Sequence, residues 1–193
     1  HLLPPFAHIP TVLTVHDLLF NRLPEHHKVL NRWYLNWTMP LYCRRAAHII
    51  AVSQTTCRDL IDLYHISPDK ITVIYEAADP KFRLQPPEVV AAVRARHTLP
   101  ERFLFYVGTI EPRKNLTRLL HAWEPLYQAG EAPPLVIGGK RGWLADDFFA
   151  ALEASPCREA VILTGYVPDA DLPGLYAAAT AFTFPSVYEG FGL

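Results

Sequence analysis

A short segment in the middle of the chain combines a glycine with two cations, residue types that suit phosphate binding. Residues 107–116 read VGTIEPRKNL. The apolar run before them predicts a strand that ends at Gly108, where the missing side chain would let a ligand approach the backbone. Arg113 and Lys114 follow, and Asn115 is placed to cap the next helix, whose N-terminus presents N–H groups and a partial positive charge. These groups would suit a diphosphate, but a solvated loop with two surface charges fits the spacing equally well.

A second segment, 184–192, reads FPSVYEGFG and places a carboxylate among glycines. Gly190 and Gly192 flank Phe191, so backbone N–H groups could come close to a ligand oxygen. Glu189 follows a predicted strand and could accept hydrogen bonds from sugar hydroxyls. Taken alone, this segment fits a glycine-rich turn with a solvated Glu better than it fits a site.

His16 comes directly after the predicted strand 11–15 and is followed by Asp17. An imidazole at a strand end can donate a hydrogen bond to a sugar hydroxyl at neutral pH, whereas a lone His after a buried strand is usually structural. At this position after a strand, the functional and the structural interpretation of His16 fit the sequence equally well. None of the nine His lies in a pair at metal-ligand spacing with thiolate support, and the adjacent His26 and His27 would point to different faces of a helix. We therefore expect no bound metal.

Strand and helix patterns alternate along the chain and would position these residues. Strands are expected at 11–15, 48–52, 71–75, 102–107, 134–138, 161–165 and 181–185. Helices are expected at 27–46, 88–97, 115–128, 144–154 and 169–179, and a further helix, capped by Ser53, stops before Pro68. Such alternation predicts an α/β fold with parallel sheets covered on both faces. Residues 76–88, with three prolines, read as a linker between two Rossmann-like units. Ligands bind outside the carboxyl ends of such strands, where the candidate residues stand.

Four aromatic residues recur at helical spacing within 27–46: Trp33, Tyr34, Trp37 and Tyr42. We interpret them as core residues rather than as an acceptor platform or a membrane face.

Composition narrows the function classes. With 19 acidic and 18 basic residues the chain gives no electrostatic case for nucleic-acid binding, which usually needs a basic face. Its apolar runs are far shorter than the ~18 residues that a membrane-spanning helix needs. Three Cys far apart indicate no disulfide framework and favour a reduced, cytoplasmic setting. The chain begins with His and breaks off after YEGFGL, so we expect a fragment.

Five segments together resemble the retaining glycosyltransferases of family 4: TVHDLLF, VSQTTCRDL, VGTIEPRKN, VIGGKRGW and LTGYVPDADLPGLYAAATAFTFPSVYEGFGL. They occur in the family's order between about residues 11 and 193. The resemblance implies the GT-B fold, two Rossmann-like domains with parallel sheets that face a cleft. Residues 1–82 would be part of an incomplete acceptor-side domain, and 83–193 a truncated domain for the nucleotide-sugar donor.

The resemblance also implies roles for matching positions. Arg113 and Lys114 match the cations that bind the donor's diphosphate. Glu189 matches the first carboxylate of a paired-glutamate motif, and His16 matches a histidine near the reacting sugar. The other matches are Gly108, which begins the phosphate loop, Gly165, Tyr166 and Val167 beside the nucleobase, and Gly190, Phe191 and Gly192 in a loop whose amides contact the sugar or phosphate.

The sequence departs from the family pattern at three places. The second glutamate of the pair would lie beyond Leu193. Thr109 stands where many relatives have Arg, which leaves open how Arg113 and Lys114 divide their work. Glu76 begins a Glu-Ala-Ala-Asp sequence where relatives often read Asn-Gly-Val-Asp, and it receives no role.

The activity implied by the resemblance is transfer of a hexose from a UDP- or GDP-sugar to a glycan or lipid-linked acceptor, with retention of configuration, in polysaccharide biosynthesis. No cofactor or metal is expected. A cytoplasmic protein is expected, and the resemblance allows peripheral contact with the inner face of the membrane. Two alternatives remain: a GT-B phosphorylase or nucleotide-sugar epimerase, and a non-catalytic fragment that binds nucleotide-sugars.

Overall fold

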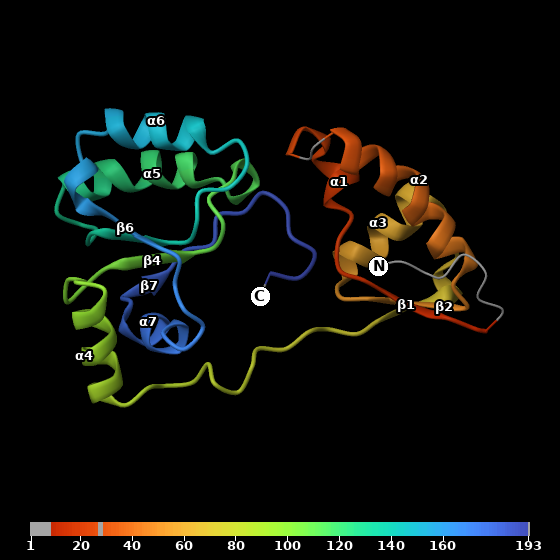
Figure 1. Cartoon of the computed structure of the whole chain (residues 1–193), viewed down its shortest axis with the longest axis horizontal. Coiled ribbons are helices and arrows are strands. Elements are labelled where there is room, and N and C mark those ends of the chain that lie inside the picture. The colour runs from red at the N-terminus through yellow and green to blue at the C-terminus, as the bar shows by residue number, and fades with distance from the viewer. Residues whose placement is uncertain (1–8, 27–28, 193) are drawn as a thin grey trace. The chain divides into compact units, whose positions relative to one another are not determined.

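A computed structural model describes residues 9–26 and 29–192 (Figure 1). Part of the predicted helix 27–46, including His27, lies outside the described residues. The chain divides into two compact units. Unit 1 comprises His1–Ala78 and Tyr188–Leu193, and unit 2 comprises Asp79–Val187. The domain limits expected from the sequence, 1–82 and 83–193, stay a prediction.

Unit 1 is built on a three-stranded parallel sheet in the order β1-β2-β3. Its strands are β1 (Val12–Val15), β2 (His48–Ala51) and β3 (Ile71–Val73), and its helices are α1 (Leu19–Arg22), α2 (Val29–Arg45) and α3 (Gln54–Tyr64), with short 3₁₀ turns at Pro24–His26 and Pro68–Lys70. Val15 lies opposite Ala51, and Ala51 opposite Val73, so the strands end at a common edge.

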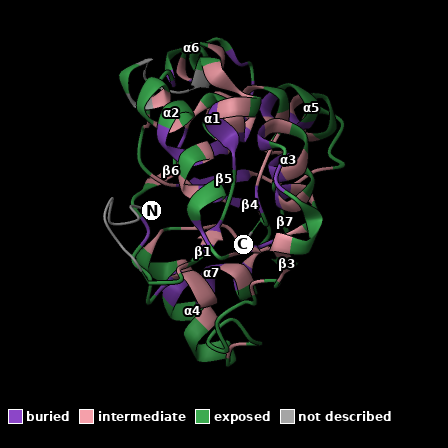
Figure 2. Cartoon of the chain, turned by 90° about the vertical axis from the view of Figure 1, so that its right-hand side faces the viewer, coloured by how far each residue is buried: buried purple, intermediate pink, exposed green. Residues whose placement is uncertain are grey.

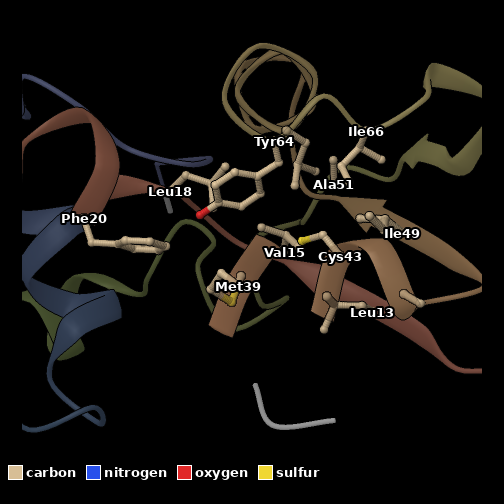
Figure 3. Packing of buried hydrophobic residues seen from close by; sticks show 12 residues of the cluster. Leu13, Val15, Leu18, Phe20, Met39, Cys43, Ile49, Ala51, Tyr64 and Ile66 are labelled. Atoms are coloured by element: carbon tan, nitrogen blue, oxygen red, sulfur yellow. The ribbon is translucent and has the colours of Figure 1, made fainter. Parts of the chain in front are cut away.

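The core of unit 1 lies on one face of this sheet. Alternate strand residues such as Val15 and Ile49 are buried against side chains from α2 and α3 (Figure 3). Val12, on the alternate face, is 59% exposed. Among the described residues, the helices of unit 1 therefore cover one face of the sheet, and the expectation of cover on both faces is not met there.

Helix α3 starts as the sequence predicts. The Ser53 hydroxyl accepts a hydrogen bond from the Thr56 N–H at 3.0 Å, which satisfies one of the N–H groups that have no partner within the helix. The helix ends at His65, which has a left-handed conformation, and Pro68 follows. The cap fixes the start of α3 close to the end of β2.

Unit 2 contains a four-stranded parallel sheet in the order β6-β5-β4-β7. Its elements are β4 (Leu104–Val107), β5 (Leu135–Gly138), β6 (Val161–Gly165), β7 (Ala181–Phe182), α4 (Pro87–Arg96), α5 (Leu116–Gln128), α6 (Asp146–Ala154) and α7 (Leu172–Ala178), with 3₁₀ turns at Pro112–Lys114 and Arg158–Ala160. Tyr106 and Ile137 pack with α5 and α6, whereas Phe105 and Val136 pack with α4 and α7. Figure 1 shows these helix pairs on opposite sides of the sheet, so the predicted cover on both faces is confirmed here.

All seven predicted strands are present, three before the linker and four after it, as expected. The last strand is shorter than the predicted 181–185, because β7 pairs with β4 only at Ala181 and Phe182. The short helix α1 and the four 3₁₀ turns were not predicted. Figure 2 shows buried positions on the strands of unit 2 and exposed positions along much of the helices.

The structure corrects the interpretation of the aromatic residues on α2. Trp33 is 75% exposed and Trp37 is 70% exposed, and Tyr34 is also exposed. Tyr42 alone packs against the core, half-buried. The prediction was wrong because α2 carries apolar residues on two faces, and Met39 and Cys43 occupy the core (Figure 3).

Candidate functional site

Three glycines lie at the carboxyl ends of neighbouring strands in unit 2. The Gly108 N–H donates to the Gly138 carbonyl at 2.9 Å, and the Gly139 N–H donates to the Gly165 carbonyl at 2.6 Å. A Cβ on Gly139 would stand only 1.9 Å from the Gly108 carbonyl oxygen, so the two strand ends meet only if position 139 is glycine. Gly165 has a φ of +68° and open space where a Cβ would stand. The space beside Gly165 is therefore open, and its place beside the nucleobase stays a prediction.

The two predicted diphosphate-binding cations lie in the turn before α5 but in different surroundings. Lys114 is only 9% exposed, and its Nζ lies 5.1 Å from the centre of the Phe184 ring. Such a cation–π contact holds the ammonium in a fixed place. The Arg113 Nε lies 2.6 Å from the Glu111 Oε1. Glu111 offsets part of the Arg113 charge, and Phe184 holds the Lys114 ammonium in place.

Asn115 occupies the N-cap position of α5 in a left-handed conformation, with a φ of 60°, but its side chain makes no capping hydrogen bond. This corrects the predicted cap. The Asn115 amide instead donates to the Pro185 carbonyl at 3.1 Å, and the Val187 N–H donates to the Arg113 carbonyl at 3.0 Å. These bonds attach the segment after β7 to the start of α5. The first turn of α5 thus receives no hydrogen bond from the side chain of its N-cap residue, and N–H groups at a helix N-terminus can bind an anion.

Tyr166 follows Gly165 and is 61% exposed, with the Lys140 Nζ 4.8 Å from the centre of its ring. The two residues come from adjacent strand ends, after β6 and after β5. They present a flat ring with a cation beside the open backbone at Gly165. Lys140 was not among the predicted site residues, although a cation directly after the VIGG strand end was a signal that could have found it.

His16, at the end of β1, pairs with Glu76, which follows β3. The His16 Nδ1 lies 2.8 Å from the Glu76 Oε1, and the two side chains are 51% and 33% exposed. A carboxylate at Nδ1 orients the ring and favours a proton on that nitrogen. The sequence placed both residues after strands but gave Glu76 no role; the structure makes it the partner of His16.

The segment with Glu189 lies directly against His16. A Cβ on Gly190 would stand 1.8 Å from the His16 carbonyl oxygen, so no other residue fits this position without movement. The Thr56 hydroxyl donates to the His16 carbonyl at 3.1 Å and lies 3.5 Å from the Gly190 carbonyl oxygen. The Phe191 ring lies 6.0 Å from the Tyr75 ring. The backbone of the glycine-rich segment is thus packed onto the end of β1.

A buried network anchors the same segment. Asp59 of α3 is 3% exposed and accepts hydrogen bonds from the Tyr188 hydroxyl at 2.5 Å and the Arg22 Nε at 2.8 Å. Burial, together with the hydrogen bond to Asp59, raises the pKa of Tyr188, so the hydroxyl stays a donor at neutral pH. The hydrogen bond to Asp59 raises the pKa of the Arg22 guanidinium. Sequence reasoning missed this network, although Asp59 lies on the buried face of α3 with Thr56 and Leu60.

The predicted site residues therefore form two groups, one in each unit. Unit 1 brings His16 together with Glu189, Gly190, Phe191 and Gly192, because Tyr188–Leu193 belongs to the same compact unit as His16. Unit 2 contains Gly108, Arg113, Lys114, Gly165 and Tyr166. We had expected Glu189 in a different domain from His16. The roles assigned to these residues stay predictions.

Two of the cavities among the described residues lie in unit 2, and neither has the properties of a donor site. One of about 120 Å³ lies beside Asn115 and Leu116, and is smaller than the roughly 300–1,000 Å³ of ordinary ligand pockets. The other, about 780 Å³, is lined by residues such as Leu99, Tyr127 and Pro134. It lies at the amino ends of the strands, opposite to the edge where parallel sheets bind ligands.

Two further findings concern metals and membranes. The described residues hold no group of three or more His, Cys, Asp or Glu side chains arranged to bind a metal ion. Binding without a metal stays a prediction. In the same residues, every helix is too short or too polar to cross a bilayer.

Comparison with known proteins places the whole chain among glycosyltransferases. The chain is 34% identical over 184 residues to O-antigen chain mannosyltransferase B of Escherichia coli, covering 94% of this chain and 48% of that protein. It is 30% identical to serotype-specific mannosyltransferase WbdA of Escherichia coli, covering 98% of this chain and 24% of the relative. The chain thus spans half or less of the length of these relatives.

The fold agrees with solved structures. The structure of HepE from Anabaena in complex with UDP and glucose matches with a TM-score of 0.74 and 22% identity, covering 95% of this chain and 48% of that one. Together with the two parallel sheets, this likeness shows the GT-B fold class that the sequence predicted. Residues 1–82 match the model for Glycosyltransferase Family 4, and residues 92–193 match the model for Glycosyl transferases group 1. Since the second match alone covers more than half of the chain, this protein belongs to the glycosyl transferases group 1 family.

Proposed function

We propose that the protein containing this chain transfers a sugar from a nucleoside-diphosphate sugar to a glycan or lipid-linked acceptor, with the donor diphosphate bound at the turn before α5. The observation that carries the proposal is the buried Lys114 beside the first turn of α5, a helix start without a side-chain cap from its N-cap residue. Family membership and two mannosyltransferase relatives support transfer over phosphorolysis or epimerisation. The names of these relatives also support mannose as the transferred sugar.

The diphosphate becomes more negative as it leaves the sugar. A fixed ammonium at Lys114, the Arg113 guanidinium and the N–H groups of α5 would stabilise that charge more in the transition state than in the ground state. Glu111 holds the Arg113 side chain by its ion pair and so restricts where the guanidinium can point. In this proposal, these cations neutralise the leaving group and no metal is needed.

The base and ribose of the donor would lie beside Gly165 and Tyr166. Open space at Gly165 allows a close approach to the backbone, and the Tyr166 ring with Lys140 offers a flat cationic surface. Either UDP or GDP can use these features, so the proposal covers both donors.

In unit 1, His16 would donate a hydrogen bond to a sugar hydroxyl, with Glu76 holding the ring. Glu189 would accept hydrogen bonds from hydroxyls of the donor sugar. We propose retention of configuration in a front-face reaction, in which the leaving phosphate takes the acceptor's proton. Support for this step comes from the family resemblance. Peripheral contact with a membrane is also part of the proposal, because a lipid-linked acceptor would be presented there.

The test is a product assay on the full-length protein with UDP- and GDP-hexoses, a labelled acceptor glycan, and inorganic phosphate in a separate reaction. We expect an extended glycan. Exchanging Glu189 for Gln (Glu189→Gln) should lower kcat/KM by about 10- to 100-fold, or ~1.4–2.8 kcal/mol, because a charge-assisted hydrogen bond is lost. The matched control is Glu131→Gln, an exposed Glu in unit 2. Formation of a sugar phosphate or an epimer without an extended glycan would contradict the proposal.

A further inference from the structure

The outer face of α2 carries a row of exposed apolar side chains, here called the aromatic stripe. Its members are Leu30 (82% exposed), Trp33 (75%), Tyr34 (47%), Trp37 (70%) and Leu41 (42%). Their spacing of three, four, seven and eleven residues from the first places them on one face of a helix. Contiguous exposed apolar surface of this kind marks an interaction site.

The core of unit 1 does not account for the stripe. Met39 and Cys43 project from the opposite face of α2 into the buried cluster around Val15 (Figure 3). Tyr42 packs partly against the same cluster. Helix α2 is therefore apolar on both faces, and its outer face is exposed in the described residues of unit 1.

The charges around the stripe identify the chemistry of that partner. No Asp or Glu occurs between Glu25 and Asp59. Arg44 lies seven residues after Trp37 and Arg45 four residues after Leu41, so both continue the face of the stripe, and both are exposed. The Lys70 Nζ donates to the Arg44 carbonyl at 2.6 Å and adds a third cation at this end. The surface is apolar, aromatic and cationic, which complements an anionic phospholipid bilayer.

The length of α2 and its residue types decide how it would meet the bilayer. With 17 residues, α2 does not qualify as a membrane-spanning helix. Tryptophan and tyrosine concentrate at the level of lipid headgroups, where a ring can be apolar at one end and hydrated at the other. We propose that the aromatic stripe lies in the plane of an anionic phospholipid surface, with Arg44 and Arg45 at the phosphates. This deepens the membrane contact of the proposed function, but binding to lipid does not depend on sugar transfer.

The test is co-sedimentation of the full-length protein with vesicles of phosphatidylcholine alone or with one third phosphatidylglycerol, at low and high salt. We expect binding to the anionic vesicles that weakens with salt. The double variant Trp33→Ser/Trp37→Ser should bind at least about tenfold more weakly, because both anchors are removed. Its control is Trp143→Ser, which removes a half-exposed tryptophan of unit 2.

The cationic end is tested separately. Arg44→Glu/Arg45→Glu should weaken partition to anionic vesicles by at least about 30-fold, because two attractions become repulsions. The control, Arg102→Glu/Arg118→Glu, makes the same change at two exposed arginines of unit 2 and should have a much smaller effect. Equal losses in the two double variants would mean that net charge alone drives binding, and would overturn the proposal.

Other occupants of the stripe give different results. A dimer in sedimentation equilibrium that Trp33→Ser/Trp37→Ser converts to monomer would show that a second copy covers it. Tryptophan emission that is already shielded from acrylamide at Trp33 and Trp37 without vesicles would show cover by the protein's own chain. Either result, or no binding to anionic vesicles at low salt, overturns the proposal. Nucleoside-diphosphate affinity of the stripe variants, measured by calorimetry, should equal that of the wild type, which separates this proposal from the proposed function.

Discussion

The two units use the same kind of parallel strand ends but fix them in different ways. In unit 2, helices cover both faces of the sheet, and the strand ends are joined by backbone contacts at Gly108, Gly139 and Gly165. In unit 1, the described helices cover one face of the sheet, and contacts between side chains hold the site in place. Glu76 pairs with His16 at the end of β1, and Asp59 binds Tyr188 of the 188–192 segment. The stability of unit 2 should therefore change little when side chains near its site are substituted, except at glycine. The stability of unit 1 should fall when a single polar residue such as Asp59 is substituted.

The largest effect is expected at Gly139. In Gly139→Ala the new Cβ would overlap the Gly108 carbonyl oxygen, 1.9 Å away, so the two strand ends must separate. We expect a loss of about 3 kcal/mol in the free energy of unfolding, the upper end of ordinary overpacking effects, and loss of nucleotide binding. The measurement is urea unfolding, with calorimetry at a temperature where the variant is folded. Gly130→Ala, where φ is +74° but the space is open, should cost only about 1–2 kcal/mol. Equal costs for the two variants would mean that the close approach at Gly139 is unimportant.

The next largest effect is expected at Asp59. Asp59→Asn leaves the Arg22 guanidinium without its buried carboxylate and weakens the bond from Tyr188. Breaking a fully buried pair lowers the free energy of unfolding by about 3 kcal/mol. Because the Arg22 side chain is partly exposed, we expect a loss of about 2 kcal/mol here. Tyr188→Phe, which removes one neutral donor, should cost about 1–2 kcal/mol. The measurements are thermal unfolding and limited proteolysis, and we expect the protease to cut the 188–192 segment faster in both variants. A variant Asp59→Asn with wild-type stability would show that the network does not anchor this segment.

The smallest effect on stability is expected at His16, where function should change more than folding. The His16–Glu76 pair is half-exposed, so His16→Ala should lower the free energy of unfolding by less than about 1 kcal/mol. Transfer to the acceptor should fall while nucleoside-diphosphate affinity stays close to wild type. Glu76→Gln keeps a hydrogen-bond partner for the ring and should have a weaker effect than His16→Ala. If folded His16→Ala transfers sugar at the wild-type rate, His16 is a structural residue.

Much of the fold could be predicted because strand and helix patterns are local. Apolar runs such as 161–165 located every strand, and Ser53 located the start of α3. Spacing could not decide which apolar face of α2 is buried, and so the exposure of Trp33 and Trp37 was missed. Periodicity shows that a face is apolar, but the packing of Met39 and Cys43 shows which face the core uses.

Partners far apart in sequence could not be predicted. Asp59 and Tyr188 are 129 residues apart, and nothing in either local pattern connects them. Asn115 had the correct residue type for a helix cap, but its side chain bonds to Pro185, 70 residues later, instead of the helix N–H groups. The candidate residues at strand ends were found because a parallel sheet collects them at one edge, whereas their supporting contacts depend on tertiary structure.

Calorimetric titration of UDP and GDP into the full-length wild type and Lys114→Met tests the central claim most directly. Methionine keeps an unbranched side chain of similar length and removes the ammonium beside Phe184, so urea unfolding of the variant is measured alongside and affinities are compared on folded protein. The account predicts an affinity loss of about 1.5–3 kcal/mol for the nucleotide that binds, the range for hydrogen bonds to charged groups. The control Lys81→Met, at an exposed lysine of unit 2, should bind as the wild type does. Unchanged nucleotide affinity in folded Lys114→Met would contradict a diphosphate site at the start of α5.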